Sequence, residues 1–433
     1  MLQKGLPFLV VIAAITIIVF GNSLNSFFWL VGLLIIIEAG SYGLVLFIRK
    51  HFPWFITPKD YFPTIGSNGL KEFIKHGYDP ELGWVRKPLT KKEEIGRDGK
   101  TLYTINAYGC RFNPGHENLA RLISCYGDSF VFCRQVNDNE TFEWHLSEIT
   151  KSNVLNFGVG NYGLDQSILR LFREYPLNKT KIVIIGVVPS TIVRILCVWK
   201  HYNEFGNVLG FKPRFGLSNG EIKLIRNIID NEEKFDHYEK FIPEINKYDE
   251  FYEGKFKKEM LRFPYFLSII SNPRRNIPIM AMVIWDRIMG KGKKEQTFPP
   301  AMKVIMNINL NLRISLFKKN RDALMLLEKL ISKFVEYGEN NDFIPIFLWM
   351  PQKDDILHIR KNKSIYYGQF ISRIKAKLTT IDLTDLLLHY DKLDELYSDD
   401  SQYGGHYNKK ANLIIADFIN KSLMQKGIYK KAN

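Results

Sequence analysis

The sequence contains few of the residues that build metal centres and disulfide frameworks. Its 433 residues include four cysteines and nine histidines. The cysteines show neither metal-ligand spacing nor a regular disulfide pattern; they are Cys110, Cys125, Cys133 and Cys197. We therefore expect free thiols in a reducing compartment, and we expect no metal and no other cofactor. Internal repeats and low-complexity segments are also lacking, which excludes a repeat architecture.

Negative charge is comparatively scarce. The chain has 60 Lys and Arg residues against 45 Asp and Glu residues, which gives a net charge of +15. Such a charge favours an anionic neighbour, either a membrane surface or a nucleic acid. The sequence shows no recognition helix, zinc motif or stacking motif of a nucleic-acid-binding protein. We therefore predict a membrane partner and no nucleic-acid partner.

Charge is almost absent from the first 50 residues. Residues 6–24 contain no charged residue, and residues 27–48 contain only Glu38. Segments of about 20 apolar residues are long enough to cross a membrane. Lys4 precedes the first segment and Arg49 follows the second, which predicts a two-helix hairpin over residues 1–50 with both ends in the cytoplasm. The main domain would then be cytoplasmic, whereas a single span would place it on the opposite side.

The rest of the chain predicts one α/β domain. Apolar, β-branched runs that are typical of buried parallel strands lie at residues 181–188, 343–350 and 377–384. We predict a three-layer domain with a mainly parallel sheet over residues 77–430, which a connector at 51–76 joins to the membrane segment. Residues 195–320 are too many for a plain loop, so they predict a helical insertion. Within the membrane segment, Glu38 should contact a neighbouring helix, because an isolated carboxylate is costly there.

A serine follows a short apolar run in the first half of the domain. The motif Tyr126-Gly127-Asp128-Ser129-Phe130 comes directly after residues 122–125. Ser129 would therefore lie where a strand ends and a helix reaching Leu146 begins. Such a turn lifts the hydroxyl above the sheet edge, and the free N–H groups of the helix start can face a developing oxyanion. Ser129 is a candidate nucleophile, and the alternative is an ordinary polar turn.

Two sequence blocks resemble the SGNH (GDSL-type) hydrolase family. The first is Gly127-Asp128-Ser129, and the second lies between Val154 and Gln166. The segments Leu82-Gly83-Trp84 and 104–111 resemble the lead-in of a membrane-anchored bacterial branch of that family. The likeness extends over residues 77–191 and returns at 343–420. It implies an SGNH-hydrolase-like, flavodoxin-like fold, ester chemistry and a place in the bacterial inner membrane.

The resemblance also implies roles for individual residues. It makes Ser129 the nucleophile and its backbone N–H one oxyanion donor. The second donor would be the backbone of Asn161, or that of Gly160 if the register shifts by one residue. Ser190 stands, next to Thr191, where the family carries an asparagine, and its hydroxyl would be the third donor.

The last block of the resemblance contains a histidine. Residues 404–408 (Gly-Gly-His-Tyr-Asn) precede a predicted helix, which makes His406 the general base. The family's aspartate, two or three residues earlier, is replaced by Tyr403 and Gly404. A backbone carbonyl could hold the ring in a Ser-His dyad, or a carboxylate could reach back from nearby. The candidates for that carboxylate are Asp399 and Asp400.

Together these features predict a membrane-anchored serine esterase or O-acyltransferase. Its substrate would be an ester, typically an O-acyl group, on a glycan or a lipid-linked precursor. The missing aspartate and asparagine suggest an alternative from another class. In that alternative the chain is a catalytically impaired partner of a membrane enzyme, such as an acyltransferase, in surface-polysaccharide assembly.

Overall fold

The computed structural model describes residues 26–52, 55, 63, 65–204, 207–289, 300–401 and 404–429. The chain forms two compact units. The large unit comprises residues 65–200, 209–250 and 309–433, and the small unit comprises residues 1–64, 201–208 and 251–308. Each unit is described separately below.

A five-stranded parallel sheet forms the centre of the large unit. Its strands are β5 (Arg121–Gly127), β6 (Asn153–Gly158), β7 (Ile182–Val187), β10 (Ile344–Trp349) and β11 (Thr379–Asp382). All neighbouring strands are parallel, in the order β11-β10-β7-β5-β6. This is the flavodoxin-like order, in which the strand sequence reverses between the first and third strands, here β5 and β7. The predicted parallel sheet is confirmed.

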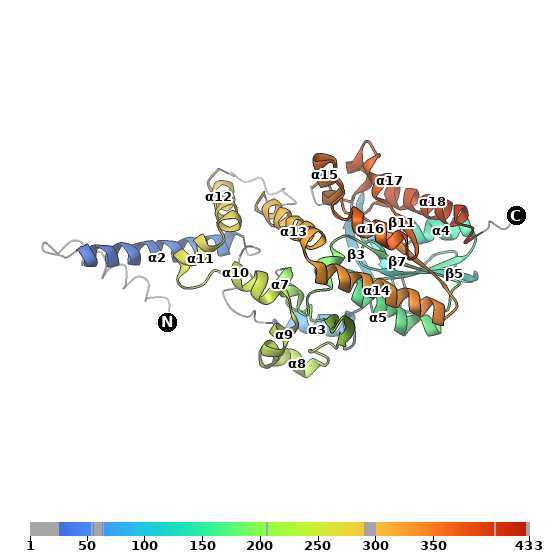
Figure 1. Cartoon of the computed structure of the whole chain (residues 1–433), viewed down its shortest axis with the longest axis horizontal. Helices are drawn as coiled ribbons and strands as arrows, with labels where there is room; N and C mark the ends of the chain where they lie inside the picture. The colour runs from blue at the N-terminus through green and yellow to red at the C-terminus, as the bar shows by residue number, and fades with distance from the viewer. Residues whose placement is uncertain are drawn as a thin grey trace. The chain divides into compact units, whose positions relative to one another are not determined.

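Helices cover both faces of this sheet (Figure 1). One face carries α4 (Phe142–Thr150) and α18 (Lys409–Gln425), and the other carries α5 (Leu164–Glu174) and α14 (Arg321–Asn340). Alternate strand residues point to opposite faces, so Ile123 and Cys125 join the core beneath α4 and α18, while Tyr126 stacks on Phe157 on the other side. Strands buried on both faces need the continuous apolar runs that the sequence contains.

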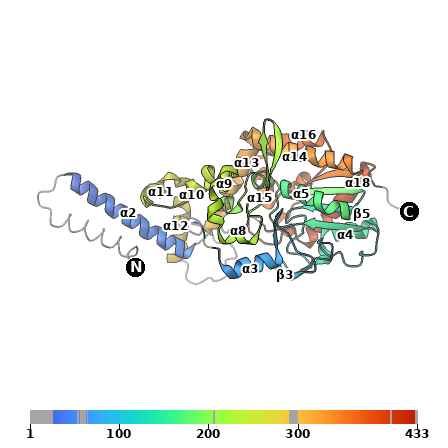
Figure 2. The same ribbon diagram turned by 90° about the horizontal axis from the view of Figure 1, so that it is seen from below.

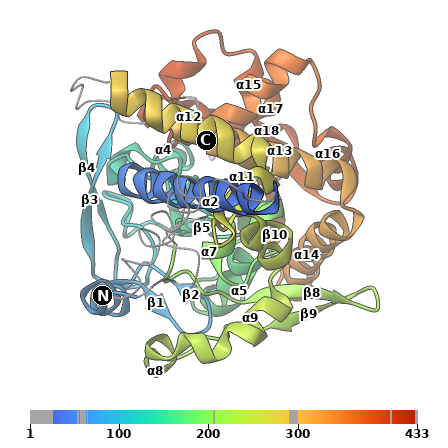
Figure 3. The ribbon, with the colours of Figure 1, turned by 90° about the vertical axis from the view of Figure 1, so that its left-hand side faces the viewer.

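Shorter elements surround the sheet. On the amino-terminal side lie α3 (Ser67–His76), β1 (Tyr78–Asp79), β2 (Gly83–Trp84) and the antiparallel hairpin of β3 (Lys91–Gly96) and β4 (Gly99–Thr104). Figure 3 shows this hairpin and a second one of β8 (Arg214–Ser218) and β9 (Glu221–Ile225). The remaining helices of the large unit are α6 (Thr191–Arg194), α8 (Glu232–Asp236), α9 (Ile242–Tyr248), α15 (Lys353–Asn362), α16 (Gly368–Lys375) and α17 (Thr384–Leu388).

Two local predictions were wrong. The segment after Ser129 is not a helix, because Cys133 and Gln135 adopt positive φ values of +54° and +68°; it forms turns, and α4 begins only at Phe142. The insertion at 195–320 is not wholly helical, because it contains the β8–β9 hairpin. Asn219-Gly220 forms its turn with φ values of +51° and +77°, the conformation that this dipeptide favours between antiparallel strands.

The small unit contains α2 (Ser26–His51), α10 (Lys257–Glu259), α11 (Tyr265–Ser271), α12 (Pro273–Met289) and the first part of α13 (Pro300–Lys319). The short helix α7 (Lys200–Asn203) lies at the boundary between the units. In α2, residues 29–51 form one helix that is long and apolar enough to cross a membrane. The first predicted span, residues 6–24, lies outside the described residues, as does most of the connector ahead of α3.

Helices α11 and α12 pack beside α2 within the small unit (Figure 2). The carboxylate of Glu38 accepts hydrogen bonds from the first two N–H groups of α11, those of Tyr265 and Phe266. A carboxylate at a helix start satisfies N–H groups that have no partner within the helix. The predicted helix contact of Glu38 is therefore confirmed, although its partner belongs to the insertion.

Candidate active site

The turn after β5 places Ser129 at the carboxyl edge of the sheet. Gly127 ends the strand where an added Cβ would lie 2.2 Å from a carbonyl oxygen of β7. The Asp128 carboxylate accepts hydrogen bonds from the Phe130 N–H at 2.8 Å and from Arg194 Nη1 at 2.9 Å. The contact with Arg194 joins the turn to the helix α6, which follows β7. Ser129 thus stands where the strand order reverses, the usual position of a binding site in such sheets.

Unpaired backbone donors occur in the turn after β5 and in the loop after β6. The N–H groups of Ser129, Gly160 and Asn161 have no hydrogen-bond acceptor among the residues that the structure describes. Asn161 has a φ of +68°, which asparagine tolerates better than most residues. Trp84 Nε1 donates to the Gly160 carbonyl at 2.9 Å and holds the loop. Free N–H groups at a sheet edge are the kind of donor that an oxyanion hole uses.

The structure distinguishes the two hydroxyl residues after β7. Thr191 Oγ1 accepts a hydrogen bond from the Leu164 N–H at 2.9 Å, so it caps the start of α5. Ser190 Oγ is buried and has no partner in the described part of the chain. Thr191 therefore has a structural role at the start of α5. The Ser190 hydroxyl, by contrast, can turn toward a new acceptor by rotation about χ1.

Two consecutive glycines bring His406 to its position. Gly404 and Gly405 have φ values of +78° and +65°. A Cβ on Gly404 would lie 2.5 Å from Lys353 Cδ, and one on Gly405 would lie 2.2 Å from Ser398 Oγ. Both the conformation and the space therefore require glycine. The family's aspartate has no room at position 404.

His406 lies against the turn that carries Ser129. Its ring packs on the ring of Phe130, the residue after Ser129, with centroids 4.9 Å apart. No hydrogen bond joins Ser129 Oγ to His406 Nε2 within the described ranges. Catalytic hydrogen bonds are often long or absent before substrate binds.

The hydrogen-bond partner of His406 is Gln135, which comes from the same turn as Ser129. Gln135 Oε1 accepts hydrogen bonds from His406 Nδ1 at 2.7 Å and from Ser398 Oγ at 2.8 Å. Gln135 Nε2 donates to the Ile95 carbonyl at 3.0 Å. The Ser398 hydroxyl also accepts from the His406 backbone N–H at 2.9 Å. The amide of Gln135 is therefore held at both ends.

This arrangement determines the tautomer of His406. If the amide of Gln135 were flipped, its oxygen would face the carbonyl of Ile95 and both would be acceptors. The oxygen therefore faces His406, and Nδ1 must carry the proton. Nε2 is left with a free lone pair, which is the form that a general base needs.

Neither predicted aspartate partners His406. Asp399 Oδ1 accepts hydrogen bonds from the N–H of Ser401 at 2.9 Å and from its hydroxyl at 2.5 Å, so it stabilises its own loop. Asp400 is exposed and pairs with Arg97 at 3.3 Å. The expected roles of both carboxylates are corrected: the neutral amide of Gln135 occupies their place.

A buried arginine shapes the turn between Ser129 and Gln135. Arg111 donates to the carbonyl oxygens of Phe132, Cys133 and Val136, each at 2.6 Å. Its Nε pairs with Asp138 at 2.8 Å, and its side chain is 1% exposed. One side chain thus satisfies three carbonyls that a helix would otherwise have paired.

Sequence reasoning missed Gln135 and Arg111. Gln135 lies six residues after Ser129, outside any motif, and an amide is not a usual partner of a catalytic histidine. One signal was present: glycine at position 404 allows the group that orients His406 to come from another segment. Arg111 lies in the lead-in segment 104–111, where nothing in the sequence indicates which carbonyls it meets.

The site is electrostatically positive. The pKa of His406 lies well below its usual value, first because the ring is buried and then because of the positive charges of Arg134, Arg194 and Arg86. Burial raises the pKa of Asp128, which nevertheless pairs with Arg194. His406 is therefore neutral, and able to accept a proton, over the physiological pH range.

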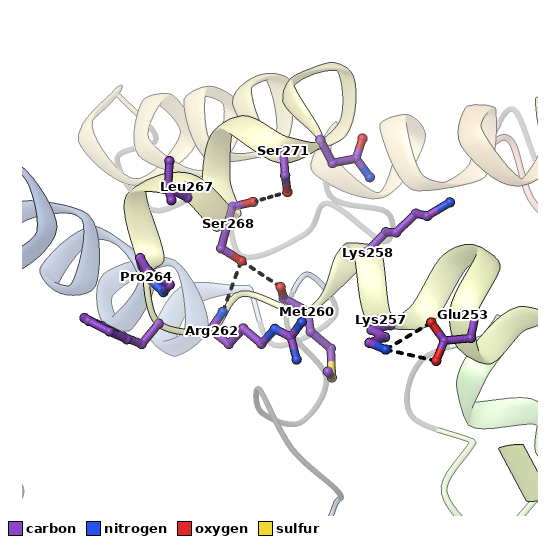
Figure 4. A pocket seen from close by; sticks show the side chains of 11 residues that line it. Glu253, Lys257, Lys258, Met260, Arg262, Pro264, Leu267, Ser268 and Ser271 are labelled. Carbon is purple, nitrogen blue, oxygen red and sulfur yellow. Dashed lines mark hydrogen bonds and ion pairs between the residues drawn. The ribbon is translucent and has the colours of Figure 1, made fainter.

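The small unit contains a separate pocket of about 660 Å³ (Figure 4). Its walls come from residues 253–272 and include Lys257, Lys258 and Arg262. Ser268 Oγ accepts from the Arg262 N–H at 3.1 Å and donates to the Met260 carbonyl at 2.8 Å, which closes the loop ahead of α11. None of the candidate catalytic residues lines this pocket.

Comparisons with known proteins add little to this geometry. No protein-family model matches the sequence, and neither does any curated protein. One solved structure that it resembles bears the provisional name of a lipolytic protein of the G-D-S-L family, from Desulfitobacterium hafniense; the two chains are 13% identical, with a TM-score of 0.32 over 70% of this chain and 99% of the other. A second solved structure is 10% identical, with a TM-score of 0.29 over 70% of this chain and 96% of the other. Likeness at this level carries no functional argument.

Proposed function

We propose that the chain is a membrane-anchored serine esterase or O-acyltransferase of SGNH type. One observation supports this most strongly: the hydrogen bond from His406 Nδ1 to Gln135 Oε1. It leaves Nε2 as a base beside the turn that carries Ser129. The unpaired N–H groups of Ser129 and Asn161 give the second component that acyl transfer requires.

The proposed reaction is a two-step acyl transfer. Ser129 Oγ attacks the ester carbonyl while His406 Nε2 takes the hydroxyl proton. The oxyanion that forms would accept hydrogen bonds from the N–H groups of Ser129 and Asn161 and from the Ser190 hydroxyl. His406 then gives its proton to the departing alcohol, and an acyl-Ser129 intermediate remains. Water, or a sugar hydroxyl in a transferase, releases the acyl group by the reverse sequence.

The membrane part of the proposal rests on α2 and the segment before it. Residues 29–51 form a helix of sufficient length and apolarity, and many of its large side chains are exposed, including Trp29, Leu33 and Phe47. A soluble protein rarely exposes so many apolar side chains on one helix. With residues 6–24 as a second span, the hairpin would hold the large unit at the cytoplasmic surface of a bacterial inner membrane. That location favours a glycan or a lipid-linked precursor as substrate.

The test is labelling of the detergent-solubilised full chain with a fluorophosphonate probe, which reacts only with an activated serine. We expect wild type to be labelled, and we expect Ser129→Ala and His406→Ala to abolish labelling. Ser332→Ala is the matched control, because Ser332 is an exposed helix serine whose hydroxyl bonds only to its own helix. Labelling that survives in Ser129→Ala would contradict the proposed nucleophile.

Failure of well-folded wild type to react would favour the other class of function. The neutral partner of His406 and the short Ser190 side chain in place of an asparagine are the features that would weaken catalysis. The chain would then be a non-catalytic partner of a membrane enzyme. Co-purification of such an enzyme from membranes, unchanged by Ser129→Ala, would support that alternative.

A further inference from the structure

Two arginines lie beside the loop that carries the proposed oxyanion donors. An added Cβ on Gly160 would lie 3.9 Å from Arg86 Nη2 and 4.0 Å from Arg134 Cδ. Both arginines share one carboxylate, that of Glu94: Arg134 Nε lies 2.9 Å and Arg86 Nη2 lies 3.8 Å from Glu94 Oε1. Two guanidinium groups thus meet a single counter-ion next to Asn161.

Arg86 is held in place by aromatic rings. Its guanidinium carbon lies 4.4 Å from the ring centres of both Tyr103 and Phe132, and Nη1 donates to the Tyr103 hydroxyl. Its Nε is buried and has no acceptor among the described residues. Rings of this kind stabilise a cation without neutralising it. The guanidinium is therefore rigid, charged and only partly satisfied by the protein.

The positive charge extends to the proposed catalytic centre. Arg86, Arg134 and Arg194 all act on His406, and the carboxylates that pair with them are Glu94 and Asp128. Arg86 and Arg134 share the single carboxylate of Glu94, which cannot neutralise both guanidinium groups. An uncompensated charge in a partly buried position is costly unless an anion binds there.

We propose that Arg86 and Arg134 bind an anionic group of the substrate next to the scissile ester. This inference rests on the proposed function and specifies its substrate class: an acyl ester whose carrier bears a carboxylate or a phosphate near the acylated oxygen. The two arginines offer the planar donors that suit either oxyanion. A carboxylate would come from an acylated acidic sugar, and a phosphate from a phosphorylated or lipid-linked glycan.

The experiment compares esters that differ by one charge. The probes are 3-acetoxybenzoate, its neutral methyl ester and 3-acetoxyphenyl phosphate, and the readout is the ratio of kcat/KM values at pH 8, where His406 is neutral. We expect wild type to favour the anionic esters at least tenfold. Arg134→Gln should bring that ratio close to one, and Arg134→Lys should restore part of it. The better of the two anionic probes indicates whether the group is a carboxylate or a phosphate.

A matched control is available in the same unit. Arg373 is about as exposed as Arg134, and its Nε likewise donates to a glutamate, Glu328, at 2.7 Å. Arg373→Gln should keep the wild-type preference. An equal preference in Arg134→Gln and Arg373→Gln would overturn the proposal, and so would the absence of any preference in wild type.

Binding separates this proposal from the proposed reaction. In Ser129→Ala, ligand-observed NMR should detect 3-acetoxybenzoate but not its methyl ester, and the double variant Ser129→Ala/Arg134→Gln should lose that signal. If Ser129→Ala binds the anionic ester in this way but wild type does not hydrolyse it, the anion site is supported and the esterase proposal is rejected. Turnover of the neutral ester without selective binding would retain the esterase and reject the anion site.

Discussion

At the scale of single residues, Gln135 gives His406 a neutral partner. A carboxylate in that position would both fix the tautomer and stabilise the imidazolium, whereas an amide oxygen does only the first. The nearby arginines add to the effect, since they also disfavour a positive ring. The base is therefore weak but correctly oriented, and it stays unprotonated in mildly acidic solution.

This predicts the pH dependence of the reaction. The base must be neutral, and the pKa of His406 is lowered, so the rate of fluorophosphonate labelling should fall only well below pH 6.5. Gln135→Glu should raise the pKa of His406 and move that fall to higher pH. Gln135→Met removes the acceptor and should slow labelling by about 100-fold or more at every pH, because the tautomer is no longer fixed.

The control for this prediction is Gly404→Asp, which places a carboxylate where SGNH hydrolases carry one. We expect it to reduce labelling rather than to shift the pH profile, because its Cβ would meet Lys353 and its backbone has a φ of +78°. If labelling of wild type and of Gln135→Glu fell at the same pH, that result would contradict the hydrogen bond between Gln135 and His406.

A second residue, Glu143, couples stability to pH. It is fully buried in α4, where burial raises its pKa from 4.5 to about 8, and Cys133 Sγ lies 3.4 Å from its Oε2. Between these values the unfolded chain is ionised and the folded chain is protonated. Stability should therefore fall as pH rises, by about 1.4 kcal/mol per pH unit from this group.

Glu143→Gln should remove this contribution. Urea midpoints at pH 5.5, 6.5 and 7.5 should show a flatter dependence in the variant, with the largest gain in stability at the highest pH. Glu339→Gln, an exposed change on α14, serves as the comparison and should follow wild type. Parallel curves for wild type and Glu143→Gln would show that the carboxyl group is ionised in the folded state.

The residues of the candidate site were only partly predictable from the sequence. Ser129 and His406 lie in recognisable blocks of the sequence. The partner of His406 was not predictable, because a hydrogen bond between positions 135 and 406 depends on a turn whose shape is set by a third segment. That segment contains Arg111.

At the scale of elements, Arg111 stabilises the turn formed by residues 128–136. Arg111→Met would leave three carbonyls without their donor and the Asp138 carboxylate without its cation. Breaking a buried charged pair typically costs about 3–5 kcal/mol. We expect a loss of stability of that size in urea unfolding, together with a loss of labelling, since Ser129 and Gln135 share this turn. Arg373→Met should change the free energy of unfolding by no more than about 0.5 kcal/mol. It should change the rate of labelling by no more than a small factor.

The strands were more predictable than the connections. The runs at 181–188 and 343–350 correspond to β7 and β10 within one or two residues, because a strand buried on both faces must be continuously apolar. The segment after Ser129 was misread as a helix. Its composition is compatible with a helix, but side-chain contacts from Arg111 and Glu94 stabilise positive φ values there.

At the scale of the whole molecule, the proposed membrane hairpin determines on which side of a membrane the large unit would lie. The hairpin prediction requires both the start of the chain and the large unit to be cytoplasmic. A fluorescent protein fused to the carboxyl end should then fluoresce in a bacterial host, and alkaline phosphatase at the same place should be inactive. A reporter inserted after residue 25 should give the opposite result. Active phosphatase at the carboxyl end would indicate a single span.

The neutral amide beside His406 links the rate of the proposed reaction to the charge of its substrate. When the imidazolium forms, no carboxylate among the described residues is hydrogen-bonded to it, and the neighbouring guanidinium groups oppose it. An acidic substrate would itself supply a negative charge beside His406. That charge would stabilise the imidazolium that forms during the substrate's own reaction. Discrimination between charged and neutral esters should then appear in kcat as well as in KM, because the substrate's anion matters most at the moment when the base is charged.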